Sequence, residues 1–241
     1  MLFVTSFCPS VDAIGSEPTM EAKQVLEDVS SITAFNTDRV NLSDSRMCIR
    51  TKGENISWDK NREYFDVEVL SPNNSFEFGL DNGDIENLIV DDILVSTGDN
   101  YAQTTEFYEG GFTRTFLIES KQSAERYSCT FEVPDGFEFV YAIDEITGKT
   151  DGSVMLVDKE GNPVMAFWKA WATDAMGNDV DTRYVIEGNT VVQIVKHRNA
   201  NYTYPIVADP SAQYNNWFSG TKSLFQSYCH YFNNSPVRGQ I

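Results

Sequence analysis

The sequence predicts a mainly β protein: an antiparallel β-sandwich with a short N-terminal helix and a helical, aromatic C-terminal tail. Three observations lead to this fold class. Short segments rich in β-branched and aromatic residues recur roughly every 8–12 positions between residues 57 and 210. Glycine, asparagine and aspartate stand between many of these segments, as tight hairpin loops require. The crossover helices that a parallel sheet needs are missing between them, so the strands are expected to be antiparallel.

The chain begins with a candidate export signal. Residues 1–13 contain a short, mostly apolar run from Leu2 to Cys8, followed by small residues at Val11 and Ala13. Small residues at this spacing end a secretory signal peptide. The run is short and no Lys or Arg precedes it, so we interpret residues 1–13 as a truncated signal peptide.

The next segment, residues 14–56, is expected to be a helical leader. Within it, residues 17–32 place several apolar side chains on one broad helical face, namely Met20, Val25, Leu26, Val29 and Ile32. Early acidic residues suit the positive end of a helix dipole. We therefore expect one short helix, which either docks on the main domain or acts as a mobile leader.

Residues 57–210 are expected to form the β-sandwich domain. Apolar and acidic residues alternate from Phe65 to Val69, which is typical of a half-buried strand. Other strands are expected at 75–78, 112–118, 127–133 and 137–143, and one or two strands are expected within 85–95. Two hairpins are predicted, one joining 154–157 to 164–168 and one joining 182–186 to 190–195. Pro210 has no amide hydrogen, so we expect strand pairing to end there.

Residues 211–241 are predicted to form an aromatic tail of different composition. This segment contains no Asp or Glu. Its aromatic residues fall near helical spacing, so one interpretation is a terminal helix that packs on the sandwich. The alternative is an exposed face for a partner or a membrane interface. That face would consist of Tyr214, Trp217, Phe218, Phe225, Tyr228 and Phe232.

Three motifs follow one another between residues 148 and 210. They are a turn from Trp171 through Asp174 to Gly177, a hairpin at Gly188-Asn189-Thr190, and a closing Tyr204-Pro205-Ile206-Val207-Ala208-Asp209-Pro210. This block resembles a β-rich region of uncharacterised secreted proteins from Gram-positive, mainly actinobacterial, bacteria. The resemblance implies export, a β-domain and a domain boundary just after Pro210, but no activity. Ala170 stands where that group often has proline.

The motif residues also have a physical interpretation as structural elements. Prolines bias the preceding residues, Tyr204 and Asp209, toward extended backbone, and Ile206 and Val207 suit a short strand between them. The Asp209 carboxylate can accept hydrogen bonds from nearby backbone amides and so fix the turn leaving this strand. We therefore expect structural rather than catalytic roles for Trp171, Asp174, Gly177, Gly188, Tyr204, Pro205, Asp209 and Pro210.

Charge restricts the possible partners. The chain has 36 acidic and 18 basic residues and a net charge of −18 at pH 7. Such a surface repels phosphate backbones and anionic lipids, so nucleic acid and membrane surfaces are not expected partners. It is compatible with cations or with a basic partner. No apolar run reaches the ~18–20 residues that a membrane-spanning helix needs.

Few residues suggest chemistry. Asp174, Asn178, Asp179 and Asp181 surround Gly177 and could offer oxygen ligands to calcium, although Asx turns explain the same residues equally well. His197 lies between Lys196 and Arg198, which disfavours a general base, and is expected to be a surface or cross-strand residue. The pairing of Cys48, Cys129 and Cys229 stays open. We expect no cofactor.

The sequence therefore predicts a non-catalytic, secreted or cell-surface β-module that binds a protein or a cell-envelope component. Two alternatives stay open. One is a carboxylate-based extracellular hydrolase, which would need two carboxyl groups about 5–10 Å apart. The other is a leader domain that restrains a C-terminal effector segment, here residues 211–241.

Overall fold

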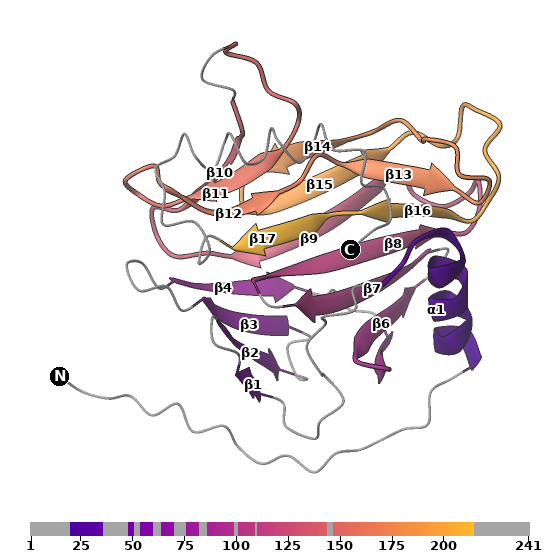
Figure 1. The fold of residues 1–241 in the computed structure, drawn as a ribbon, viewed down its shortest axis with the longest axis horizontal. Helices are drawn as coiled ribbons and strands as arrows, with labels where there is room; N and C mark the ends of the chain where they lie inside the picture. The colour runs from indigo at the N-terminus through magenta and orange to yellow at the C-terminus, as the bar shows by residue number, and fades with distance from the viewer. Residues whose placement is uncertain are drawn as a thin grey trace.

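Two antiparallel β-sheets pack face to face, and one helix lies beside them (Figure 1). This computed structural model describes residues 20–35, 48–50, 54–59, 64–69, 76–81, 86–98, 101–108, 110–143 and 147–214. The predicted fold class, a mainly antiparallel β-sandwich with a short N-terminal helix, is confirmed. The predicted signal segment and the helical tail beyond Tyr214 lie outside the described residues.

The smaller sheet has seven strands in the order β1-β2-β3-β4-β9-β15-β14. They are β1 (Cys48–Arg50), β2 (Glu54–Asp59), β3 (Tyr64–Val69), β4 (Phe76–Asp81), β9 (Arg126–Glu132), β15 (Thr190–Val195) and β14 (Thr182–Glu187). The sandwich therefore begins before residue 57, because β1 and β2 pair with each other and β2 pairs with β3.

The larger sheet has ten strands, eight of them in the order β10-β11-β12-β17-β8-β7-β6-β5. They are β10 (Glu138–Tyr141), β11 (Val154–Val157), β12 (Pro163–Phe167), β17 (Ser211–Tyr214), β8 (Gly111–Ile118), β7 (Tyr101–Tyr108), β6 (Ile93–Gly98) and β5 (Glu86–Val90). The remaining two, β13 (Trp171–Asp174) and β16 (Ile206–Asp209), pair with each other, and β16 also pairs with β8.

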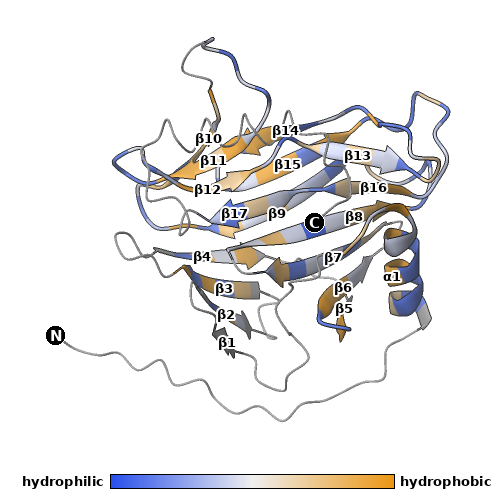
Figure 2. Cartoon of the chain, in the orientation of Figure 1, coloured by the Kyte–Doolittle hydropathy of each residue, from blue (hydrophilic) through white to orange (hydrophobic). Residues whose placement is uncertain are grey.

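The main core lies between the two sheets. On β3 the predicted alternation holds: Phe65, Val67 and Val69 are buried, while the side chain of Asp66 is exposed. Phe112 of the larger sheet meets Phe131 of the smaller one with ring centroids 6.3 Å apart. Each buried aromatic side chain contributes roughly 2 kcal/mol through the hydrophobic effect. Figure 2 shows the hydrophobic strands β10–β12 in orange and the surrounding loops in blue.

Helix α1 (Met20–Ile32) covers part of the outer face of the larger sheet (Figure 1). Ala22, Val25 and Val29 are buried against apolar residues of β5–β8 and β16, including Leu117 and Val207. The predicted helix over 17–32 is thus confirmed from Met20 onward, and it docks on the main domain rather than standing apart.

Two strands occupy the segment 85–95, and a two-residue turn joins them. Asp91 and Asp92 form this turn between β5 and β6, with φ angles of 48° and 66°. Left-handed backbone at both central positions matches the twist of a hairpin. The two acidic residues thus turn the chain within its apolar run.

Strand pairing continues past Pro210, contrary to the prediction that it ends there. The carbonyl of Pro210 accepts a hydrogen bond from the Arg114 amide at 3.2 Å, and β17 then pairs with both β12 and β8. One missing amide interrupts the ladder for a single residue only. The β-domain therefore extends at least to Tyr214, whose side chain is fully buried in the core.

Candidate functional site

The candidate calcium ligand Asp174 is held by N–H groups. Its Oδ1 accepts hydrogen bonds from the amides of Met176 (3.0 Å) and Asn178 (2.8 Å), and its Oδ2 accepts one from Thr203 N at 3.0 Å. The Asn178 Nδ2 reaches both oxygens. Burial alone would raise the pKa of Asp174, but these donors, led by Thr203 N, hold it below its usual value. Asp174 therefore stabilises a turn, as the Asx-turn interpretation requires.

The other calcium candidates also have structural partners. Asp181 forms an exposed ion pair with Lys196 at 3.0 Å, and Asp179 forms an isolated bridge with Thr173. Within the described ranges, no three side chains of His, Cys, Asp and Glu gather as a metal site would require. These acidic residues lie near one loop, but their carboxylates do not form a cluster that could bind a metal ion.

A second loop repeats the arrangement around Asp174, a repeat that sequence reasoning missed. Asp158 accepts hydrogen bonds from the amides of Glu160 and Asn162, and the Asn162 Nδ2 reaches both of its oxygens. Both loops read Asp-x-x-Gly-Asn, with the glycine at φ 80°. This shared five-residue pattern is the signal that could have identified both turns as structural.

His197 is fully buried, so of its two expected positions, surface or cross-strand, the surface one is wrong. Its Nε2 lies 2.9 Å from the carbonyl of Ala124, so this nitrogen must donate. Its Nδ1 lies 2.8 Å from the hydroxyl of Tyr204, and in the neutral ring it accepts a hydrogen bond from that hydroxyl. Nε2 thus joins His197 to the loop before β9, and Nδ1 joins it to Tyr204, seven residues further along the chain. The motif residue Tyr204, followed by a cis bond to Pro205, contributes to this contact.

Asp209 lies at the end of β16, opposite Trp171 of β13. Ser211 Oγ donates to its Oδ1 at 2.8 Å, and Ser211 in turn contacts Thr113 Oγ1 at 3.1 Å. Burial raises the pKa of this carboxyl to about 7, although hydrogen bonds from Ser211 and Trp171 lower it. Backbone amides were expected to donate to the Asp209 carboxylate, but the donors in the structure are the side chains of Ser211 and Trp171.

The remaining motif and tail residues divide into two groups. Gly177 and Gly188 have positive φ angles of 80° and 61°, which explains the need for glycine at both turns. Tyr214, expected on a partner face, is instead a core residue of β17. The other residues of that face lie outside the described residues, namely Trp217, Phe218, Phe225, Tyr228 and Phe232.

One cysteine is described at the level of its side chain. Cys129 is a free thiol, buried on β9. Burial raises its pKa, although the neighbouring Arg114 guanidinium lowers it. A buried thiol with a raised pKa is a poor nucleophile.

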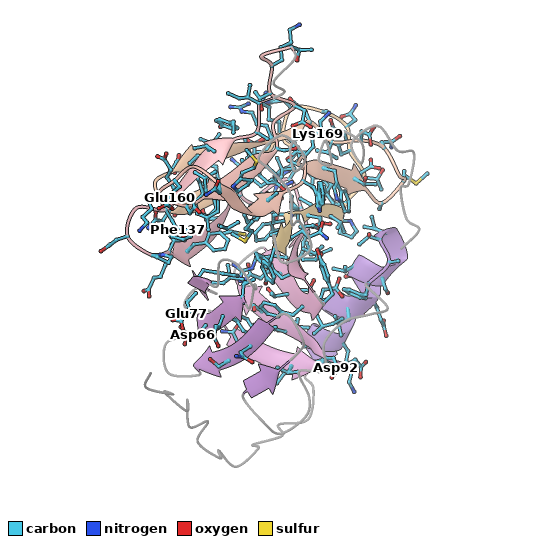
Figure 3. All side chains as sticks on the ribbon, turned by 60° about the vertical axis from the view of Figure 1, so that its left-hand side comes forward. Asp66, Glu77, Asp92, Phe137, Glu160 and Lys169 are labelled. Atoms are coloured by element: carbon cyan, nitrogen blue, oxygen red, sulfur yellow. The ribbon has the colours of Figure 1, made fainter. Side chains whose placement is uncertain are left out.

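Carboxylates gather on the outer face of the smaller sheet. Glu68 of β3 lies directly opposite Glu77 of β4, and Glu68 accepts a hydrogen bond from Asn55 of β2. In the next row, Asp66 and Glu132 both pair with Gly79. We name this surface the acidic sheet face; it comprises Asn55, Ser57, Asp66, Glu68, Glu77 and Glu132. Figure 3 shows Asp66 and Glu77 close together and well apart from Glu160.

The acidic sheet face is chemically suited to binding positive charge. Asp66, Glu77 and Glu132 are exposed, and Glu68 is half-buried. Like charges directly opposite in a sheet destabilise it, so the Glu68–Glu77 pair costs folding energy. Sequence reasoning found the acidic composition but not this face, because strand register decides which acids become neighbours.

No helix of the described part of the chain is long and apolar enough to cross a membrane. Comparisons with protein-family models, with curated proteins and with solved structures found no match for this chain.

Proposed function

We propose that this chain is a non-catalytic, secreted or cell-envelope module that binds a positively charged protein or cell-envelope component through its acidic sheet face. The carrying observation is the cross-strand pair of Glu68 and Glu77, two carboxylates directly opposite each other, beside the exposed Asp66 and Glu132. Charge complementarity of this kind attracts a cationic partner and selects against anionic ones. Residues 1–13 and the resemblance of residues 148–210 to secreted bacterial proteins support the extracellular location.

The buried polar residues support a binding role over a catalytic one. Asp174 and Asp158 stabilise turns, and both ring nitrogens of His197 are engaged in structural hydrogen bonds. A general acid or base must exchange a proton with a substrate within hydrogen-bond reach. Groups held by neighbouring backbone and side chains serve the fold instead.

Binding to a decalysine peptide, measured by calorimetry with the full chain, tests the proposal. The double variant Asp66→Lys with Glu77→Lys is expected to lose roughly tenfold in affinity near 150 mM salt, because local charge complementarity is reversed. The matched control, Glu138→Lys with Glu160→Lys, makes the same change in net charge on exposed residues elsewhere and is expected to stay within about twofold.

The outcome separates a specific face from bulk charge. Equal losses in both double variants would contradict the proposal, because net charge alone would then explain binding.

The single variant Glu77→Lys gives a second check. It converts a repulsive cross-strand pair into an attractive one and is expected to raise the free energy of unfolding by roughly 0.5 kcal/mol while weakening binding. In such a binding face, the like charges that attract the partner also lower the free energy of unfolding.

A further inference from the structure

Strand β14 forms an edge of the smaller sheet; among the strands that the structure describes, it is hydrogen-bonded to β15 alone. Two bonds show which backbone groups face this edge. The Val195 amide points to β9, since it donates to the Glu125 carbonyl, and the Lys196 amide points to β14, since it donates to the Asp181 carbonyl. Backbone groups alternate along a strand. In β15 the even-numbered residues therefore face β14, and their partners in register are the odd-numbered residues of β14. Tyr184 and Ile186 consequently direct their amides and carbonyls away from β15, toward the open edge.

One side chain already occupies part of this edge. The hydroxyl of Tyr141, on edge strand β10 of the other sheet, donates to the Tyr184 carbonyl at 3.2 Å. Figure 1 shows β10 and β14 near each other in the same half of the molecule. Open edges invite pairing with other chains, and proteins protect an edge by covering it. Tyr141 therefore partly blocks the β14 edge.

The sequence of β14 is complementary to itself in one antiparallel register. When Tyr184 of one copy pairs with Ile186 of another, the outward backbone groups of both strands meet. The same register places Arg183 opposite Glu187 at both ends and Val185 opposite Val185 at the centre. Shifting by two residues in either direction breaks the arginine–glutamate pairs. The register that pairs Tyr184 with Ile186 thus also places opposite charges directly across from each other.

We propose that β14 is a pairing edge for a second copy of this chain, and that Tyr141 controls access to it. Two strands joined in this way form a two-fold symmetric interface, in which the same residues serve both copies. Arg183 and Glu187 lie on the outer face with exposed side chains. Glu187 already binds Arg126 through Oε1 at 2.7 Å, which leaves its second oxygen for Arg183 of the other copy.

Sedimentation equilibrium of the full chain over a range of concentrations tests this inference. Tyr141→Ala removes the blocking ring and is expected to strengthen dimerisation at least about tenfold relative to the unmodified chain. Tyr141→Phe keeps the ring and removes the hydroxyl, so it is expected to give a smaller increase. The milder variant supplies the answer if the alanine variant fails to fold, as judged by circular dichroism.

Charge variants identify the interface. Added to Tyr141→Ala, Arg183→Glu is expected to abolish the dimer, because it opposes Glu187 of the other copy. Adding Glu187→Arg to that variant restores opposite charges in the same register and is expected to restore the dimer. A chain that stays monomeric throughout the Tyr141 variants would overturn the inference. So would a dimer that is insensitive to Arg183→Glu, because it would use another surface.

Discussion

Asp174 and Asp209 stand at opposite ends of one strand pair, β13 with β16, and their surroundings act on their protonation in opposite directions. Asp174 is buried, which raises its pKa, but the amides of Thr203, Asn178 and Met176 and the Asn178 side chain hold that pKa below its usual value. Asp209 is buried, and its pKa is raised to about 7. Asp174 therefore stabilises the fold above its unfolded pKa of 3.8, and this contribution is lost as pH falls through its folded pKa. Asp209, whose pKa is raised, stabilises the fold at low pH, and this contribution is lost as pH rises through about 7.

Asp209→Asn is expected to reduce the decline in stability between about pH 5 and pH 8. The folded carboxyl binds its proton more tightly than the unfolded one, so its contribution is complete below the unfolded pKa of 3.8 and lost as pH rises through about 7. The loss over this interval is on the order of 2–3 kcal/mol. Urea unfolding at the two pH values measures it. The exposed Asp135→Asn serves as control, and equal slopes in the wild type and Asp209→Asn would refute the assignment.

At the scale of elements, helix α1 shows how a short segment is held. Its thirteen residues are too few for a stable isolated helix, so the apolar contacts with the larger sheet must supply its stability. Val29 belongs to that contact and is fully buried, as are Leu117 and Val207. The opposite side of the helix carries exposed residues such as Lys23 and Glu27.

Val29→Asp is expected to lower the free energy of unfolding by about 3 kcal/mol, because it places a charge in an apolar contact. Hydrogen exchange should also accelerate within residues 20–32. The neighbouring Ser30→Asp makes the same charge change on the exposed side of the helix and is expected to stay within about 0.5 kcal/mol. Similar losses in both variants would show that helix propensity, rather than docking, sets the stability.

The elements also show what could be predicted from sequence. Alternation predicted β3, and glycine-containing loops predicted the β11–β12 and β14–β15 hairpins, because these signals are local. The local pattern left open whether residues 85–95 hold one strand or two, because acidic residues such as Asp91 and Asp92 inside an apolar run can either interrupt one strand or turn the chain between two. Neither β17 nor the acidic sheet face could be predicted, since both depend on pairing between distant segments. The Asx turn at Asp174 follows from the local pattern, whereas its bond from Thr203 and the contacts of His197 depend on partners far along the chain.

At the scale of the whole molecule, the excess of negative charge destabilises the folded state through repulsion between like charges. The net charge of −18 on 241 residues makes the folded surface repel itself, and the acidic sheet face concentrates part of that repulsion. A bound cationic partner would relieve it and so stabilise the fold by mass action. Dimers joined through β14 would also bring two acidic sheet faces into one assembly, which raises the avidity for a repetitive partner.

Raising sodium chloride from about 20 mM to about 300 mM is expected to increase the free energy of unfolding, because salt screens repulsion between exposed charges. The Glu77→Lys variant, which carries less repulsion at its surface, is expected to gain less. Urea unfolding at each salt concentration measures both. A stability that falls with salt would mean that attractive ion pairs, rather than repulsion, dominate the surface.

Strand β17 has a consequence for the order of folding. The larger sheet contains two groups of neighbouring strands, β5–β8 and β10–β12, and among the described strands β17 alone is hydrogen-bonded to both. A ribosome has made almost all of the domain before it adds residues 211–214. Until those residues emerge, the nascent polypeptide lacks the piece that joins its two halves, so the sheet can close only late in translation.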